Sequence, residues 1–314
     1  MTARRRIRIG TRGSDLALWQ ARHVAEALRA AHPGLEVELC EIVTSGDRDR
    51  TRPLSEIGGK GVFVREIERA LLEGDVDLAV HSLKDLPARP PEGLVLLPTV
   101  ARAPVEDVLV VREEMARTPL SDLPEGFAVG TGSLRRGALL RRHVPNAAPV
   151  PIRGNVPTRL AKVGETVDGV VLARAGLERL GIVPATARIL PVDPFLPAPC
   201  QGLLGLEARE GDAFVAEKVA GIADAVATVA MTVERAFVAR LGADCNVPVG
   251  ALAEVFGDRV EARAMVVMPD GSRRVNATWS GPLERAAEGG RALAEVLLEA
   301  GGAEILADLA APTA

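Results

Sequence analysis

Short apolar runs alternate with amphipathic stretches along most of the chain, a pattern typical of an α/β fold. Apolar or alternating runs predict strands at 6–10, 35–44, from Asp77, at 94–99 and at 107–111. Helical spacing of apolar residues after Ser14 and over 62–72 predicts helices between the first of these strands. Ser14 is a good residue to cap the first helix. We therefore expect an α/β domain with largely parallel strands.

A second series of similar units follows the strand at 107–111. Residues 127–129 and 168–173 are predicted strands, and residues 134–143 and the stretch opening at Ala175 are predicted helices. Residues 151–160 repeat the order of strand, glycine turn and helix. These units predict a second α/β domain.

The pattern changes again in the last part of the chain. A proline-rich stretch, 189–207, ends in a predicted strand and is typical of a connection between domains, so we expect the chain to return there to the first domain. A helix is predicted over 212–241 and alternating strands over 251–280, with two closing helices from Pro282 and Ala303. This segment predicts a small α+β domain.

Composition narrows the class of protein. The chain has 314 residues, enough for two or three domains, with 47% hydrophobic and 25% charged residues and a net charge of −4. The acidic balance argues against a non-specific nucleic-acid binder. The basic N-terminus lacks an apolar stretch of the signal-peptide kind, and no apolar run approaches the length of a membrane span. We expect a cytoplasmic protein.

The cysteine and histidine content is also typical of a cytoplasmic protein. Three cysteines, Cys40, Cys200 and Cys245, form no C-x-x-C pair, which favours a reducing compartment over a disulfide framework. The four histidines are not spaced as metal ligands, and we expect no metal site. A lone loop cysteine such as Cys245 is by itself more often inert than functional.

Candidate chemistry begins after the strand at Asp77. Ser82, Lys84 and Asp85 follow within a few residues, at the carboxyl end of a strand, where open α/β sheets handle ligands. A hydroxyl, an ammonium and a carboxylate there can bind an acid group and move a proton. The alternative is a surface turn whose charges only interact with water, and the local stretch alone leaves both open.

Two further groups of residues favour an anion site. Arg12 and Ser14 occupy a strand-to-helix turn, where free N–H groups and the helix dipole attract anions. For Gln20, one and a half turns later, the sequence favours a solvated side chain. In the second domain, arginines recur near successive strand ends, which predicts a concave pocket for a multiply anionic ligand: Arg135, Arg136, Arg153, Arg159 and Arg179. A glycine-rich loop at 45–61 that contains Lys60 is a possible lid.

Taken together, eight motifs in order resemble the porphobilinogen deaminase (hydroxymethylbilane synthase) family. They are IGTRGSDLALWQA, GGKGVFVREIE, HSLKD, GTGSLRR, IRGNVPTRL, AGLERLG, PAPCQGLLGLE and ADCNVPVGA. The resemblance implies two α/β domains like those of periplasmic binding proteins, with hinge crossings, plus a small α+β C-terminal domain. The implied boundaries are 1–101 with 201–221 for domain 1, 102–200 for domain 2 and 222–314 for domain 3.

The resemblance also implies a chemistry. Family members carry a covalent dipyrromethane cofactor on a cysteine that Cys245 matches, and Asp85 matches the catalytic aspartate. Four porphobilinogen molecules are joined head to tail with loss of ammonia, and hydroxymethylbilane is released for porphyrin and haem biosynthesis. The residues matching carboxylate binders and their helpers are Arg12, Ser14, Ser82, Lys84, Thr131, Ser133, Arg135, Arg136, Arg153, Arg159, Arg179 and Gln201. The family expectation is a cytoplasmic monomer that binds neither nucleic acid nor membrane.

Four positions depart from the family pattern. Gly132 stands where serine is common, and Cys200 replaces a glycine or alanine. Pro157 replaces a common glycine, consistent with the first position of a helix, and Asp244 precedes Cys245 where glycine is usual. None removes a residue assigned to the chemistry. Two alternatives are a non-catalytic, two-lobed anion-binding protein and a relative that has lost activity. Neither is favoured, because the first leaves Asp85 without a role and the second is at odds with the intact Asp85 and Cys245.

Overall fold

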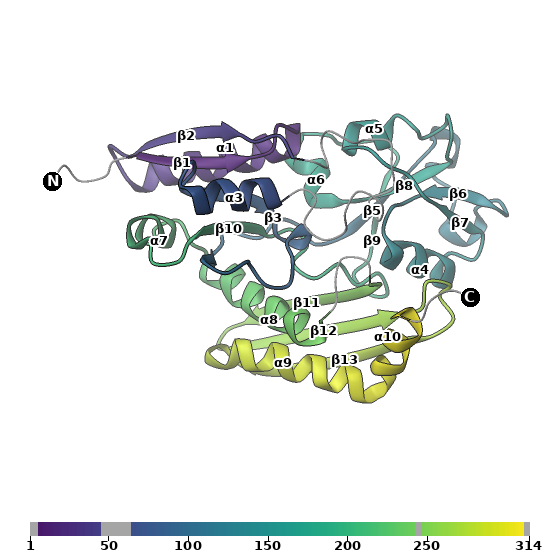
Figure 1. Ribbon diagram of the computed structural model, residues 1–314. Coiled ribbons are helices and arrows are strands. Elements are labelled where there is room, and N and C mark those ends of the chain that lie inside the picture. Colours follow the sequence, from purple (N-terminus) through teal and green to yellow (C-terminus); the bar gives the residue numbers. More distant parts are fainter. Residues whose placement is uncertain (1–5, 45–63, 243–246, 311–314) are drawn as a thin grey trace. The chain divides into compact units, whose positions relative to one another are not determined.

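A computed structural model describes residues 6–44, 64–242 and 247–310 (Figure 1). The chain divides into two compact units. Unit 1 holds residues 1–103 and 202–231, and unit 2 holds residues 104–201 and 232–314. The chain therefore leaves unit 1 near residue 103 and returns to it near residue 202.

Unit 1 is built on a five-stranded mixed sheet with the order β2-β1-β3-β10-β4. β1 runs parallel to β2 and β3, whereas β10 is antiparallel to β3 and β4. β10 is the strand that the chain forms directly after its return at residue 202. The strands are β1 (Arg6–Thr11), β2 (Glu36–Glu41), β3 (Leu78–Ser82), β4 (Leu94–Leu97) and β10 (Leu204–Arg209).

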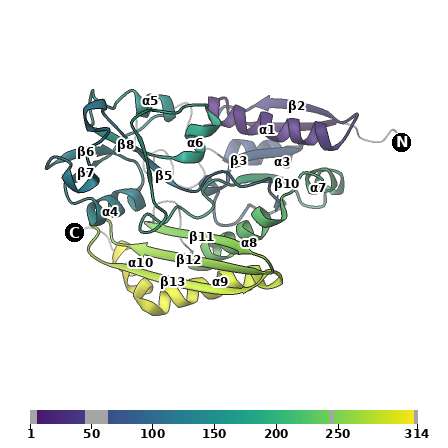
Figure 2. The same cartoon turned by 180° about the vertical axis from the view of Figure 1, so that it is seen from behind.

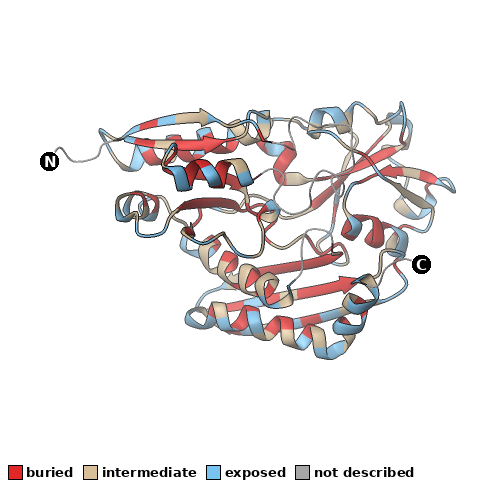
Figure 3. Cartoon of the chain, in the orientation of Figure 1, coloured by how far each residue is buried: buried red, intermediate tan, exposed pale blue. Residues whose placement is uncertain are grey.

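Helices cover both faces of this sheet. α1 (Asp15–Ala31) and α7 (Ala213–Ala220) pack on one face, where their buried side chains join Ile9, Val80 and Leu206 in one core. α3 (Arg65–Glu73) packs on the other face, where its Ile67 and Leu71 join Ala79. Alternate residues of β3 therefore point to different helices. The central strands β3 and β10 are almost entirely buried, as Figure 3 shows for β10, whereas the edge strand β2 has a single buried residue.

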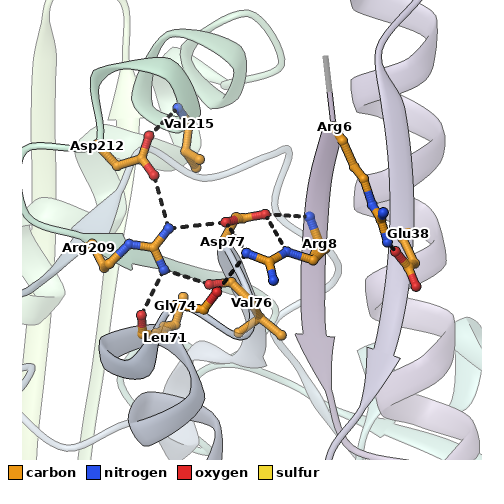
Figure 4. A network of polar contacts seen from close by, with 10 residues as sticks. All are labelled: Arg6, Arg8, Glu38, Leu71, Gly74, Val76, Asp77, Arg209, Asp212 and Val215. Carbon is orange, nitrogen blue, oxygen red and sulfur yellow. Dashed lines mark hydrogen bonds and ion pairs between the residues drawn. The ribbon is translucent and has the colours of Figure 1, made fainter. Parts of the chain in front are cut away.

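A buried ionic network fixes the start of β3 (Figure 4). Arg8 and Arg209 approach the Asp77 carboxylate from opposite sides, at 2.9 Å and 3.1 Å from its Oδ1. Arg8 Nη2 also donates to Gly74 O, and Arg209 Nη1 donates to Leu71 O. The guanidinium donors thus neutralise a nearly inaccessible carboxylate and join β1, β3, β10 and the end of α3. The network thus anchors the start of β3, and the strand runs from there to its carboxyl end at Ser82.

Unit 2 contains a second five-stranded sheet of the same design, with the order β7-β6-β8-β5-β9. β6 is parallel to β7 and β8, and β5 is antiparallel to β8 and β9. Three helices follow the parallel strands: α4 (Leu134–His143), α5 (Val156–Leu160) and α6 (Arg174–Arg179). The strands are β5 (Asp107–Val111), β6 (Phe127–Gly130), β7 (Ala147–Val150), β8 (Gly169–Ala173) and β9 (Ala187–Leu190).

The C-terminal part of unit 2 is an antiparallel sheet of β11 (Val249–Phe256), β12 (Arg259–Val267) and β13 (Arg274–Pro282). α9 (Ala286–Leu297) runs along this sheet, as Figure 2 shows. A π-helical turn (Leu298–Gly302) leads into α10 (Ala303–Ala310). Leu252, Met265 and Val267 belong to the same core as Leu109 and Phe127 of the five-stranded sheet.

The predicted fold class is confirmed, with differences in detail. The helix predicted over 212–241 is two helices, α7 and α8 (Ala225–Leu241). Residues 221–224 separate them, beginning with Gly221, the C-cap of α7. The strand expected at the start of 151–160 is β7, which ends earlier, at Val150. β9 ends at Leu190 and so overlaps the start of the proline-rich stretch, 189–207, where a connection is expected. Pro157 occupies the second position of α5, after the cap Asn155, instead of the first.

Candidate active site

A cavity of about 90 Å³ opens in unit 1 at the carboxyl ends of β1 and β3. Because these strands are parallel neighbours, the residues that follow them meet at one edge of the sheet. Arg12 and Ser14 come from the turn after β1, and Ser82 and Asp85 come from the end of β3 and the turn beyond it. The structure thus brings together four of the residues that the sequence predicts.

A hydrogen bond between α1 and β3 orders this cavity. Gln20 is buried, and its Nε2 donates to Ser82 Oγ at 2.9 Å. Ser14 begins the same helix, and its side chain accepts a hydrogen bond from Ala17 N. The interpretation of Gln20 as a solvated side chain is therefore wrong. Its amide reaches across to β3, which a solvated position on the helix would not allow.

Lys84 and Asp85 lie on a single 3-10 turn, Leu83–Asp85, that directly follows β3. Leu83 is fully buried and its N–H donates to Leu203 O, just before β10. Lys84 is half-buried, whereas Asp85 is exposed at the cavity. The buried leucine thus holds the turn while the carboxylate remains accessible to a ligand.

Unit 2 presents the second set of predicted residues at the corresponding edge of its own sheet. Thr131 follows β6, and Ser133 caps α4 by accepting a hydrogen bond from Arg136 N. Thr131 Oγ1 in turn accepts a hydrogen bond from Ser133 N at 3.1 Å. Because β6 is parallel to β7 and β8, the turns that carry the predicted arginines leave the same edge.

Arg135 and Arg136 are buried and form ion pairs with Asp107 at 2.8 Å and 2.7 Å. Gln201 Nε2 donates to Oδ1 of the same carboxylate at 2.9 Å. Burial by itself would raise the pKa of Asp107, but the two guanidinium groups lower it well below its ordinary value. Within the described residues, Arg135 Nε has no hydrogen-bond partner, so this buried donor of the cluster is unsatisfied.

Arg153, Arg159 and Arg179 follow β7 and β8. Arg153 Nη1 is buried without a hydrogen-bond partner among the described residues. Arg159 Nε donates to Gly154 O at 2.8 Å, which orders the glycine turn before α5. Burial lowers the pKa of Arg179 to about 10, and its guanidinium still carries a charge at pH 7. These three arginines bring positive charge to one edge of the sheet.

Two predicted residues, Lys60 and Cys245, lie outside the described residues. Asp107 is the main site residue that the sequence reasoning missed. It opens an apolar strand, DVLVV, and a charge at that position looks like an ordinary strand end. The available signal was the pair Arg135–Arg136 in the first turn of a helix, where cations oppose the dipole and require an anion nearby.

The described residues contain no group of histidine, cysteine or acidic side chains suited to a metal ion. No helix in the described part of the chain is long and apolar enough to cross a membrane. The fold and the site together define an α/β protein whose strand ends present guanidinium, hydroxyl and amide donors, together with the exposed carboxylate of Asp85.

Comparison with known proteins identifies the family. The family profile "Porphobilinogen deaminase, dipyromethane cofactor binding domain" matches residues 7–217, and "Porphobilinogen deaminase, C-terminal domain" matches residues 228–299. The porphobilinogen deaminase of Roseiflexus castenholzii is 47% identical over 305 residues, 97% of this chain and 99% of that protein. The porphobilinogen deaminase of Syntrophotalea carbinolica is 45% identical over 304 residues, 96% of each chain. The chain belongs to the porphobilinogen deaminase family, and it is an enzyme of the transferase class.

Among solved structures, an ancestral cationic amino acid solute-binding protein matches 69% of this chain and 87% of its own. The sequence identity is 18% and the TM-score is 0.44. The periplasmic aliphatic sulphonate-binding protein SsuA of Escherichia coli matches 74% of this chain and 70% of its own, with 16% identity and a TM-score of 0.39. The assignment of the fold class rests on the strand order and directions given above.

The cofactor named by the family profile can be tested against the residues present. A dipyrromethane bears acetate and propionate groups, and carboxylates favour guanidinium partners. Arg153 Nη1 and Arg135 Nε are buried donors that still need acceptors within the described part of the molecule. An unsatisfied buried donor destabilises a structure, and a bound carboxylate would satisfy it. The donor set of unit 2 therefore fits the group.

Proposed function

We propose that the chain condenses four porphobilinogen molecules head to tail, releasing ammonia at each step and hydroxymethylbilane at the end. The observation that carries this proposal is the grouping of Arg12, Ser14, Ser82 and Asp85 around one cavity. The family profiles and relatives bearing the name porphobilinogen deaminase support the reaction. A pathway of tetrapyrrole synthesis, leading to porphyrins and haem, is the corresponding biological role.

Asp85 is the proposed catalytic residue. Loss of ammonia from the aminomethyl group of porphobilinogen leaves positive charge spread onto the pyrrole nitrogen. A carboxylate within hydrogen-bond reach of that N–H stabilises the charge as it develops. The same carboxylate can accept the proton that leaves the ring carbon after the new bond forms. Asp85 is suited to both because it is exposed at the cavity while Leu83 holds its turn.

The remaining predicted residues are proposed to bind carboxylates or to assist. In unit 1, Arg12 and Lys84 supply positive charge, and Ser14 and Ser82 supply hydroxyl groups. In unit 2, the proposed binders are Thr131, Ser133, Arg135, Arg136, Arg153, Arg159, Arg179 and Gln201. Arg135, Arg136 and Gln201 share the Asp107 carboxylate, so a ligand would meet a cluster whose donors are already ordered.

Cys245 is the proposed attachment point of dipyrromethane through a thioether, and Lys60 is proposed to act from a lid. The cofactor, when bound, supplies the free pyrrole ring to which the first substrate is joined. The residues of the chain itself bind the acid groups, through the arginines of unit 2, and stabilise the developing positive charge, through Asp85. We further propose three domains, with boundaries at 1–101 with 201–221, 102–200 and 222–314.

We also propose that the protein acts as a monomer in the cytoplasm, with porphobilinogen as its small-molecule partner. Cys40 is a free thiol, which supports a reducing compartment. The monomeric state rests on the resemblance to the family.

The test of the proposed function is a product assay. Purified protein is incubated with porphobilinogen, and ammonia and the linear tetrapyrrole are both quantified. We expect one ammonia for each porphobilinogen consumed and one tetrapyrrole for every four. Binding of porphobilinogen without release of ammonia would contradict the proposal and would favour a non-catalytic binding protein.

A further inference from the structure

Behind the cavity, on the face of the unit 1 sheet that α3 covers, lies a buried cluster of three titratable side chains. Glu68 comes from α3, His81 from β3 and Glu207 from β10. All three are buried, and Glu207 is only 1% exposed. Neither the predicted chemistry nor the proposed binding set uses any of them. Burying titratable side chains costs desolvation free energy, so the presence of three of them in one cluster needs an explanation.

His81 and Glu207 face each other across two antiparallel strands. The register pairs His81 with Gly205 and Ala79 with Glu207, which makes the two side chains diagonal neighbours on one face. His81 Nε2 lies 3.4 Å from Glu207 Oε2. Within the described residues, neither atom has a hydrogen-bond partner, so this ion-pair distance is the polar contact between them. Each is therefore the polar group available to the other.

Glu68 completes the cluster. Burial raises the pKa of Glu68, and the nearby Glu207 raises it further, while His81 and Arg65 lower it. Of the two carboxyl groups, Glu207 is the one whose Oε2 lies against the imidazole Nε2.

The same strand, β10, also forms the surface on which the Asp85 turn lies. Leu203 O, just before β10, accepts a hydrogen bond from Leu83 N at 3.1 Å. Gly205 lies opposite His81, and a Cβ there would approach Leu86 Cδ1 to 2.8 Å and Leu83 Cδ1 to 3.2 Å. The backbone of β10 is therefore in close contact with the residues on both sides of Lys84 and Asp85. A shift of β10 against β3 would move that turn.

His81 itself borders the cavity that Asp85 lines, one residue before Ser82. Ser82 points to the α1 side, where Gln20 holds it, and His81 points to the α3 side, where Glu207 holds it. The end of β3 is thus fixed on both faces immediately before the catalytic turn.

We propose that His81 is a positioning residue for Asp85, and that it acts by donating from Nε2 to Glu207 and so locking β3 to β10 beneath the turn. This inference rests on the proposed function, because a role in positioning has meaning only where Asp85 is catalytic. His81 makes no contact with the reacting atoms in this account. The distance between the carboxylate and the pyrrole N–H is what it controls, and misplacement by about 1 Å can lower a rate by about 100-fold.

The experiment compares three variants of the full-length, cofactor-bearing enzyme. His81→Leu removes the donor, His81→Gln keeps an N–H that can reach Glu207, and His23→Leu changes an exposed histidine on α1 as a matched control. We expect His81→Leu to lower kcat by about 10- to 100-fold with KM within about twofold of wild type. His81→Gln should recover most of kcat, and His23→Leu should match the wild type.

A second readout does not depend on turnover. The protein has four histidines, so the ring nitrogens of His81 can be assigned by ¹⁵N NMR with the His81→Gln variant as reference. We expect Nε2 of His81 to carry the proton in the wild type and to lose that preference in Glu207→Met. A His81 ring protonated on Nδ1 alone, or a His81→Leu variant with kcat within about twofold of wild type, would overturn the inference. An inactive wild-type enzyme would instead overturn the proposed function, and this inference with it.

Discussion

Asp107 Oδ1 lies 2.7 Å from Arg136 Nη2, and both side chains are buried. Arg135 binds the other carboxylate oxygen, Oδ2, at 2.8 Å. One carboxylate from the first strand after the crossing therefore orders two adjacent guanidinium groups at the start of α4. The sequence suggests that Arg135 and Arg136 bind a carboxylate of the ligand. In the structure the carboxylate of Asp107 already binds both, which fixes the orientation of the two guanidinium groups before any ligand binds.

The first prediction concerns this cluster. Asp107→Asn leaves two buried guanidinium groups without their anion, so we expect a loss of about 3–5 kcal/mol in the free energy of unfolding. Urea unfolding at pH 7 measures it. Asp122→Asn, at an exposed position whose carboxylate accepts only from Ser121 among the bonds seen here, is the control and should change stability little. A loss below about 1 kcal/mol for Asp107→Asn would contradict the assignment.

The pH dependence of that loss has a defined sign. The pKa of Asp107 is lowered in the folded state relative to its ordinary value of 3.8. Its contribution is therefore fully present above that ordinary value and is lost as the pH falls towards the folded-state pKa. The difference in unfolding free energy between wild type and Asp107→Asn should be constant near neutral pH and shrink under acid conditions. A difference that grows on acidification would contradict this sign.

The second prediction concerns Asp85. Because its carboxylate is exposed and its turn is held by Leu83, Asp85→Ala should leave the fold and the bound cofactor intact. It should nearly abolish release of ammonia from porphobilinogen, since no other carboxylate among the residues lining the cavity can replace it. Asp75→Ala, in the loop before β3, provides a control in the same domain. Substantial turnover by Asp85→Ala would remove this residue from the mechanism.

The third prediction separates a binding arginine from structural ones. Arg153 Nη1 has no hydrogen-bond partner within the described residues, so Arg153→Gln should leave the unfolding free energy within about 0.5 kcal/mol of wild type. Loss of a charge-assisted bond to a carboxylate should raise KM by about 10-fold or more. Arg259→Gln, on an exposed strand end of the C-terminal sheet, is the control. An unchanged KM would exclude Arg153 from carboxylate binding.

The fourth prediction concerns Cys200, which is buried with φ of +64°. Its N–H donates to Glu234 at 2.5 Å, so the backbone conformation is held in place. Any side chain in this left-handed region is disfavoured by about 1–2 kcal/mol, and glycine is not. Cys200→Gly should therefore be more stable than Cys200→Ala by about 1 kcal/mol, the reverse of the order in a helix interior. Equal stability, or a more stable alanine variant, would contradict the geometry.

The sequence predicts the parts of the site that depend on local order. Ser14 caps α1, Ser133 caps α4 and Asp85 follows β3, because each depends on neighbours within a few residues. Asp107 and Gln20 were missed or misjudged because their partners are distant in sequence. Arg136 is 29 residues from Asp107, and Ser82 is 62 residues from Gln20. Such pairs exist only once the sheets have formed.

Glu207 illustrates the same limit on the fold. In the sequence it is one acidic residue within an apolar strand, and nothing nearby shows that its partner is His81. Glu207 lies near His81 because β10 pairs antiparallel with β3. In the sequence, β10 follows all five strands of the second sheet, at the point where the chain returns to unit 1. Register between distant strands is set by the tertiary structure, and short-range patterns do not contain it.

The central claim is that Cys245 carries the cofactor on which the product is assembled, and the mass of the intact denatured protein tests it most directly. Protein from a host that makes tetrapyrroles should be heavier than its sequence by two linked pyrrole units. Cys245→Ser should lose that mass, and Cys200→Ser should keep it. A wild-type chain with the mass of its sequence alone would contradict the account.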